Sequence, residues 1–217
     1  GITKFLDSNG KPILYGTVEN DSINASDVWS MPNLWPRSLS GVTIITGAGR
    51  DALTGGFGAD NLYGGVGDDI LDGRDNAGGD LLDGGLGNDT YYADEGDTIR
   101  DADGNGTGYL NGKQLTFATR KKGETVWKDS AGNTYALTNG KLEINDPLVI
   151  EGFANGNLGI YLDEEEDPND PNKAPKPPAY NPNNAVQRWD PLVLDLVGNG
   201  QIDAVGSTAS TVYFDFN

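Results

Sequence analysis

The sequence predicts an all-β protein in which a parallel β-roll is followed by a small antiparallel β cap. A stretch rich in glycine and aspartate repeats with a nine-residue period, and 32 of the 217 residues are glycine. The later part of the chain alternates apolar and polar residues between turn signals. Because glycine carries a high backbone-entropy cost, this many glycines indicate a repeated structural requirement.

The composition excludes several classes of function. With 33 acidic and 15 basic residues the formal net charge is −18, which opposes binding to nucleic acids and electrostatic docking on anionic membranes. The sequence has no cysteine and no histidine, so disulfides, the usual zinc or iron sites and Ser-His-Asp or Cys-His catalysis are excluded. A cation held here is expected to be a hard ion with oxygen ligands, calcium before magnesium.

Residues 1–41 are the expected N-terminal flank of the repeats. The segment is mixed in composition and includes Trp29, Pro32, Trp35 and Pro36. It could cap the first repeat or simply precede it, and the sequence leaves its role open.

Residues 42–106 contain the repeats, with the shared pattern G-G-x-G-x-D-x-U-x, where U is apolar. Nearly perfect copies are GGFGADNLY from Gly55, GGVGDDILD from Gly64 and GGLGNDTYY from Gly84. Imperfect copies are TGAGRDALT from Thr46, the longer GRDNAGGDLLD from Gly73 and a frayed turn near Gly96. One copy alone would be read as a flexible loop, but several copies with a fixed period predict stacked repeats.

The physical chemistry of the pattern suggests a role for each half of the repeat. The G-G-x-G half permits positive φ angles, forms a turn and leaves carbonyl oxygens free to face an ion, and the aspartate adds a charged oxygen. The x-U-x half is a short strand that points U inward. The expected narrow core is the series Leu53, Leu62, Leu71, Leu82 and Tyr91. Two repeats make one coil, so ions should lie in two columns, one along each edge.

This segment closely resembles the RTX repeats of type-I-secreted bacterial toxins and enzymes. The resemblance implies calcium between successive turns, held by aspartates and glycine-turn carbonyls in roughly four well-formed sites. The implied aspartates are Asp51, Asp69 and Asp89 on one edge, and Asp60, Asp80 and Asp97 on the other. The implied turn glycines are Gly47, Gly49, Gly56, Gly58, Gly65, Gly67, Gly85 and Gly87.

The resemblance also implies a biological role. The chain is expected to be a monomeric calcium-binding module of a secreted, extracellular protein that uses the type I secretion machinery. It is not expected to insert into a membrane or to bind nucleic acid. Because the aspartates repel one another without metal, calcium is expected to switch folding on outside the cell.

Residues 107–162 are expected to form the β-rich C-terminal cap, with hairpin turns at Asn111-Gly112 and Asn139-Gly140. Just before the cap, Asp101-Ala-Asp103-Gly-Asn105 matches the first half of an EF-hand loop. Position twelve of such a loop would be Gly112 instead of glutamate, so a plain Asp/Asn/Gly turn is the alternative. The stretch 150–162 also looks like the flank that follows RTX repeats in many secreted proteins.

Residues 163–188 are acidic and proline-rich and are expected to be an extended linker. Residues 189–217 begin with a run similar to the start of the calcium-induced self-processing module of FrpC-like RTX proteins, and look like a truncated copy of it. The resemblance implies autocatalytic cleavage at Asp190-Pro191. The Asp190 carboxyl would attack its own carbonyl carbon, the Pro191 nitrogen would leave as the new N-terminus, and water or a lysine amine would open the resulting anhydride. One departure is Val197, which stands where the family's calcium loop has a carboxylate.

Three functions therefore remain open at this point. The first is a non-enzymatic calcium-responsive module for secretion and extracellular folding. The second is autocatalytic cleavage at Asp190-Pro191. The third is a carbohydrate-binding or adhesin module, for which Trp29, Trp35 and Trp127 would be the stacking surfaces.

Overall fold

The computed structural model describes residues 2–25, 41–74, 78–145, 147–165, 192–197, 201–204 and 212–213. Nearly all regular structure in these ranges is β-strand, with one 3-10 turn, η1 (Asn157–Gly159). Across the same residues, no helix has the length and apolar character needed to cross a bilayer. The chain divides into two compact units, Gly1–Pro168 and Asn169–Asn217.

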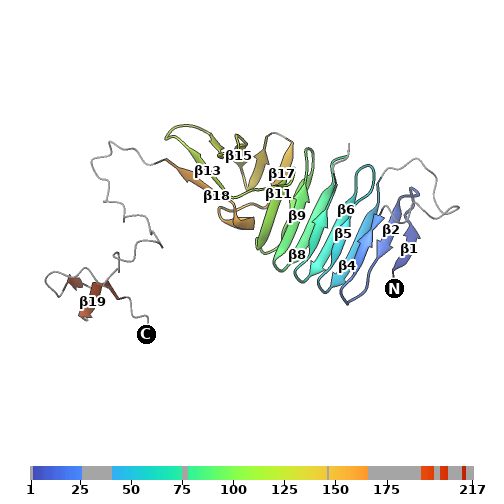
Figure 1. Ribbon diagram of the computed structural model, residues 1–217, viewed down its shortest axis with the longest axis horizontal. Helices are drawn as coiled ribbons and strands as arrows, with labels where there is room; N and C mark the ends of the chain where they lie inside the picture. The colour runs from blue at the N-terminus through green and yellow to red at the C-terminus, as the bar shows by residue number, and fades with distance from the viewer. Residues whose placement is uncertain are drawn as a thin grey trace. The chain divides into compact units, whose positions relative to one another are not determined.

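The first unit contains two sheets (Figure 1). The first sheet has the order β1 (Thr3–Leu6), β2 (Pro12–Tyr15), β4 (Thr43–Ala48), β6 (Asn61–Val66), β8 (Leu81–Leu86), β10 (Thr98–Arg100), β17 (Leu148–Glu151), β16 (Lys141–Ile144), β15 (Thr134–Thr138), β14 (Val126–Lys128), β13 (Phe117–Arg120) and β18 (Tyr161–Glu164). The second sheet has the order β12 (Lys113–Gln114), β11 (Gly106–Leu110), β9 (Asp89–Ala93), β7 (Ile70–Asp72), β5 (Ala52–Thr54) and β3 (Ser22–Asn24).

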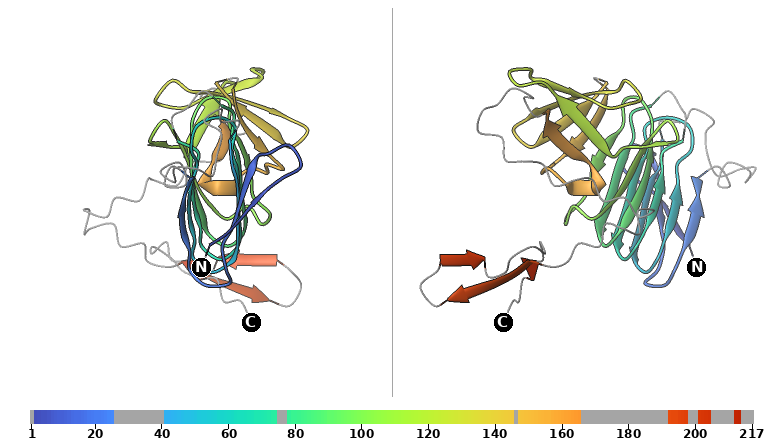
Figure 2. Two further views of the ribbon diagram at one scale, coloured as in Figure 1. Left: turned by 90° about the vertical axis from the view of Figure 1, so that its right-hand side faces the viewer. Right: turned by 60° about the vertical axis from the view of Figure 1, so that its left-hand side comes forward.

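The repeats form a parallel β-roll, as predicted. Strands β4, β6, β8 and β10 are successive parallel neighbours in the first sheet, and β5, β7 and β9 in the second. The chain passes from one sheet to the other and back, so two nonapeptides make one coil. Viewed along the roll, the coils superimpose as a flattened ring (Figure 2, left).

The core of the roll is one side chain wide on each sheet. The predicted series Leu53, Leu62, Leu71, Leu82 and Tyr91 is fully buried, which confirms the inward position of U. Leu14, Ile44, Ile99 and Ile23 extend the two strips at their ends. Because each repeat contributes a single large apolar side chain, no repeat can bury its own core, and stability depends on stacking.

The roll extends beyond the nonapeptide repeats at both ends. Strands β2 and β3 pair in parallel with β4 and β5, so the predicted flank 1–41 supplies a coil of its own. At the other end, β11 pairs in parallel with β9, although this segment was predicted to open an antiparallel cap. The hairpin at Asn111-Gly112 is present, and it turns β11 back into the short strand β12.

The cap that follows is mainly antiparallel, as predicted. Strands β13 to β17 form a meander, Asn139-Gly140 closes the β15–β16 hairpin with positive φ at both residues, and β17 pairs in parallel with the last roll strand, β10. The cap therefore covers the end of the first sheet of the roll, where an open strand edge would otherwise remain. Strand β18 closes the far side of the meander by pairing in parallel with β13.

The second unit contains a β-hairpin of β19 (Leu192–Val197) and β20 (Gln201–Ala204), with β21 (Val212–Tyr213) parallel to β19. The predicted scissile pair Asp190-Pro191 lies outside the described residues, as do Trp29 and Trp35. Most of the predicted linker, from residue 166 onward, also lies outside them.

Candidate calcium sites

The turns between the two sheets stack along the two edges of the roll. The first edge carries turns 16–21, 46–51, 64–69 and 84–89, each between a strand of the first sheet and a strand of the second. The second edge carries turns 55–60, 73–80 and 93–97, of which residues 75–77 are not described. The structure therefore brings the predicted aspartates together as two separate columns.

On the first edge, each aspartate carboxylate contacts the turn before it. Oδ1 of Asp51 accepts the backbone N–H of Asp21 at 2.7 Å, and Oδ1 of Asp69 accepts the N–H of Asp51 at 2.8 Å. Oδ1 of Asp89 accepts the N–H of Asp69, also at 2.8 Å. A continuous ladder of carboxylates therefore runs parallel to the roll axis.

The second edge has the same ladder. Oδ1 of Asp60 accepts the N–H of Val42 at 2.6 Å. Oδ1 of Asp80 accepts the N–H of Asp60, and Oδ1 of Asp97 accepts the N–H of Asp80, both at 2.8 Å. The assignment of three aspartates to each edge therefore agrees with the geometry, including Asp97 in the frayed last turn.

These carboxylates are buried at the two edges of the roll. All six are at most 2 % exposed, and on the first edge Asp51, Asp69 and Asp89 take no part in the ion pairs found among the described residues. On the first edge, Oδ2 of Asp51, Asp69 and Asp89 is buried and has no hydrogen-bond partner. Buried, unpartnered carboxylate oxygens are costly, which indicates that a cation belongs beside them.

The pKa values of these aspartates also show that burial disfavours their ionised form. Burial is the main reason that the pKa of Asp89 is raised to about 7, and the nearby charges of Asp69, Asp101 and Asp103 also raise it. The hydrogen bond from the backbone N–H of Asp69 lowers the pKa but only partly offsets this rise. Burial likewise raises the pKa of Asp97 to about 6 and also raises those of Asp60 and Asp69. A divalent cation would reverse this by favouring the ionised carboxylates.

The first glycine of each repeat makes room for the carboxylate of the same turn. A Cβ on Gly55 would lie 2.5 Å from Oδ2 of Asp60, and a Cβ on Gly64 or Gly84 would collide with the aspartate five residues later. A side chain at this position would displace the carboxylate, which explains why the repeat begins with glycine.

The remaining turn glycines permit close stacking of the turns. Gly67 has a φ of +134°, and a Cβ there would collide with the carbonyl oxygen of Gly49 in the turn before. Gly65, Gly85 and Gly87 face the carbonyls of Gly47, Gly65 and Gly67 in the same way. Backbone carbonyl oxygens therefore lie between successive turns, beside the carboxylate ladder.

This donor set fits calcium. Among the described residues, no three acidic side chains converge closely enough to hold a metal ion by themselves. A site must therefore combine one or two carboxylates with backbone carbonyls, a mixture of hard oxygen ligands that calcium accepts. The residues present supply both kinds of donor on each edge.

The two edges differ in how their second carboxylate oxygens are satisfied. On the second edge, Oδ2 of Asp60 accepts the N–H of Gly56 at 2.6 Å, and Oδ2 of Asp97 accepts the N–H of Asp94 at 2.9 Å. On the first edge, Oδ2 of Asp51, Asp69 and Asp89 has no such donor. The first edge therefore has the stronger electrostatic need for a cation.

The segment with partial EF-hand likeness forms the last turn of the first edge. Gly106 pairs with Asp89, and the Asp103 carboxylate accepts the N–H of Gly87 at 3.1 Å. Asp101 accepts the Tyr91 hydroxyl at 2.6 Å and backbone N–H groups of its own turn. Gly112, the twelfth loop position, lies in the next hairpin. The geometry thus agrees with a closing Asp/Asn/Gly turn.

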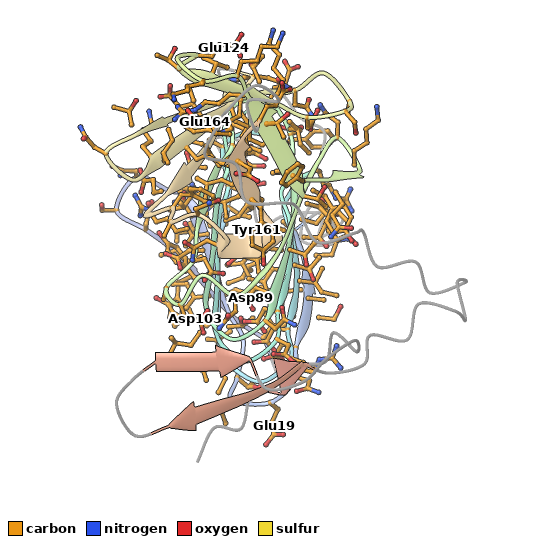
Figure 3. All side chains as sticks on the ribbon, turned by 90° about the vertical axis from the view of Figure 1, so that its left-hand side faces the viewer. Glu19, Asp89, Asp103, Glu124, Tyr161 and Glu164 are labelled. Atoms are coloured by element: carbon orange, nitrogen blue, oxygen red, sulfur yellow. The ribbon has the colours of Figure 1, made fainter. Side chains whose placement is uncertain are left out.

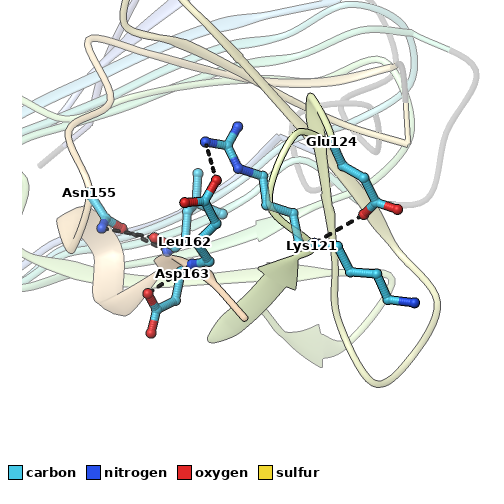
Figure 4. A network of polar contacts seen from close by, with 7 residues as sticks. Lys121, Glu124, Asn155, Leu162 and Asp163 are labelled. Carbon is cyan, nitrogen blue, oxygen red and sulfur yellow. Dashed lines mark hydrogen bonds and ion pairs between the residues drawn. The ribbon is translucent and has the colours of Figure 1, made fainter. Parts of the chain in front are cut away.

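Trp127, one of the three predicted carbohydrate-stacking residues, lies in the cap. It is partly buried against the core, and the Arg120 guanidinium lies 3.9 Å from the centre of its ring. Arg120 also pairs with Glu164 at 3.4 Å, while the backbone N–H of Lys121 bonds to Glu124 (Figure 4). One face of the indole is therefore already used within the protein.

Comparison with known families agrees with the repeat geometry. Residues 45–78 and 74–99 match the family model of the RTX calcium-binding nonapeptide repeat (4 copies). The comparisons with curated proteins and with solved structures gave no match. The matched residues carry all six aspartates of the two columns, so both columns lie within the part of the chain that is similar to these calcium-binding repeats.

Proposed function

We propose that the β-roll binds calcium between successive turns on both edges and that this binding drives its folding. The observation that supports the proposal most is the set of buried carboxylate oxygens of Asp51, Asp69 and Asp89, which lack any partner in the described protein. The expected ligands are the six column aspartates and the carbonyl oxygens of the turn glycines.

In this proposal calcium supplies charge neutralisation between turns. Each ion would face carboxylates from neighbouring turns of one column and offset the repulsion between them. The ion would also bind the backbone carbonyl oxygens of the glycine turns, which face the next turn of the same column. Because the unfolded chain has no preformed site, the binding free energy would appear as folding free energy.

The biological setting follows from this dependence on calcium. The chain would remain unfolded where free calcium is scarce, pass through a type I secretion machinery, and fold once it is outside the cell. The net charge of −18 favours this sequence of events, since self-repulsion opposes compaction until cations bind. In this proposal the roll acts as a calcium-responsive folding module of a secreted protein.

A calcium-binding isotherm of the full chain tests the proposal. Titration calorimetry after removal of metal with EGTA should show several calcium ions per chain, and magnesium at the same concentration should compete poorly because it demands a stricter octahedral shell. Simultaneous Asp51→Asn, Asp69→Asn and Asp89→Asn substitution should remove the sites of the first edge. An unchanged calcium count in that triple variant would contradict the proposed ligands.

A further inference from the structure

We propose that the column on the first edge begins one turn before the matched repeats, with a calcium ion bound between turn 16–21 and turn 46–51. This inference rests on the proposed function, because it adds a site to the same column. Residues 16–24 read GTVENDSIN and keep three elements of the nonapeptide pattern: Gly16, Asp21 and the apolar Ile23. Thr17 and Glu19 stand where the pattern has glycine.

The strands around turn 16–21 belong to the roll. Leu14 of β2 pairs with Ile44 of β4, and Ile23 of β3 pairs with Leu53 of β5, so each of the two residues continues one of the inward-facing strips. Ile23 is 2 % exposed and extends the strip that contains Leu53. Residues 12–24 therefore form one coil, and turn 16–21 occupies the position of a repeat turn at the edge.

The carboxylate ladder reaches this turn without a break. The N–H of Asp21 donates to Oδ1 of Asp51 at 2.7 Å, the same contact that links Asp51 to Asp69. The Asp51 carboxylate is thereby held against turn 16–21, and its other oxygen is buried without a partner. A buried, unpartnered oxygen on a carboxylate that contacts turn 16–21 indicates that a ligand belongs beside these two turns.

Backbone carbonyls are also in equivalent places. A Cβ on Gly47 would lie 2.8 Å from the carbonyl oxygen of Thr17, and a Cβ on Gly49 would lie 2.9 Å from that of Glu19. One turn further on, the carbonyls of Gly47 and Gly49 face the next pair of glycines in the same manner. Turn 16–21 therefore offers carbonyl oxygens at the positions that the glycine turns use.

Two further contacts repeat between turns. Asn20 Oδ1 accepts the N–H of Arg50 at 2.8 Å, as Asp68 Oδ1 accepts the N–H of Asn88 at 3.0 Å. These contacts occupy the fifth position of each turn, next to the ladder aspartate. They give turn 16–21 the stacking contacts of a true repeat despite its missing glycines.

Within the turn, Asp21 is already held in place. Its Oδ2 lies 2.6 Å from where a Cβ of Gly16 would be, and it accepts the N–H of Thr17 at 2.5 Å and the Thr17 hydroxyl at 2.9 Å. Thr17 thus fixes the carboxylate that would meet the ion. Glu19 adds an exposed carboxylate at the same edge of the roll as Asp89 and Asp103 (Figure 3).

Native mass spectrometry of the full chain in calcium tests the site through Asp21→Asn. The matched control is Asp163→Asn, which removes the same charge from an exposed residue of β18 at the opposite end of the first sheet. We expect Asp21→Asn to bind one calcium ion fewer than both the wild type and Asp163→Asn. Equal calcium counts in the two variants would overturn the inference while leaving the proposed function intact.

A second variant avoids any damage to the turn itself. Tyr15 lies next to Gly16, so a terbium ion bound in the calcium position should be sensitised by its ring. Tyr15→Phe keeps the packing of Tyr15 against Phe5, whose ring centre lies 5.8 Å away, and should lower terbium luminescence without changing the calcium count. Unchanged terbium luminescence in Tyr15→Phe would mean that no ion binds near this turn, which would contradict the inference. A wild-type chain that binds no calcium at all would overturn the proposed function as well.

Discussion

Truncation of one core leucine should weaken calcium-driven folding by a predictable amount. Leu71 is fully buried in β7, and its only large apolar neighbours in the same strip are the residues of the adjacent coils, Leu53 and Tyr91. A narrow core cannot close over the space that Leu71→Ala would leave, so we expect a cost of about 3 kcal/mol, within the usual range for buried leucines.

Linkage turns this cost into a change in calcium requirement. If folding is coupled to roughly four calcium ions, about 3 kcal/mol corresponds to about 0.75 kcal/mol per ion, or a calcium midpoint about 3.5-fold higher. The assay is a calcium titration followed by far-ultraviolet circular dichroism. The matched control is Ile70→Ala, which truncates the neighbouring side chain, 42 % exposed on the outer face.

The control should move the midpoint much less, because its side chain is largely solvated in the folded state. Equal shifts in Leu71→Ala and Ile70→Ala would refute the claim that a single inward strip stabilises the roll. A large cost without any change in the calcium midpoint would refute the coupling between folding and calcium.

Three other predictions follow from the same structure. Gly67→Ala should raise the calcium midpoint far more than Gly132→Ala, because both glycines have positive φ but only Gly67 lies against another turn; similar midpoints would argue against close stacking. Asp69→Asn should lower calcium affinity while Asp163→Asn leaves it unchanged, as measured by calorimetry; equal affinities would remove Asp69 from the ligand set. If the bond after Asp190 is cleaved autocatalytically, calcium should convert the intact mass into two fragments, and Asp190→Asn should prevent this; an unchanged wild-type mass would exclude cleavage of this chain.

The nine-residue period was sufficient to predict the roll and its inner strip. Each U position, from Leu53 to Tyr91, is buried because the period places it on the same inward face in every coil. The same spacing predicted which aspartates share an edge, since alternate repeats occupy the same side of the roll. These features depend on local sequence and a repeated geometry, both of which are visible in the sequence.

The ends of the roll could not be predicted in the same way. Turn 16–21 keeps only part of the pattern, and Asp21 precedes Asp51 by more residues than one coil contains, so the period search misses it. Strand β11 is followed by the Asn111-Gly112 hairpin, which suggested an antiparallel element, yet its other edge pairs in parallel with β9. In both cases tertiary pairing, rather than local pattern, decides the outcome.

The difference between the two edges was also invisible in the sequence. Asp51 and Asp60 occupy the same position of the repeat, but only Asp60 receives a hydrogen bond at Oδ2 from its own turn, through Gly56. This depends on the direction of a single backbone N–H, which composition and spacing do not specify. The Tyr91 hydroxyl is similar, since its U position predicted burial but not its bond to Asp101.

Hydrogen exchange of the full chain, compared in EGTA and in calcium, tests the central claim most directly. If calcium drives folding of the roll, backbone amides of residues 43–74 and 78–110 should exchange freely in EGTA and become strongly protected in calcium, including the ladder amides of Asp51, Asp69 and Asp80. Full protection of these amides in EGTA, with metal analysis showing no bound ion, would contradict the account.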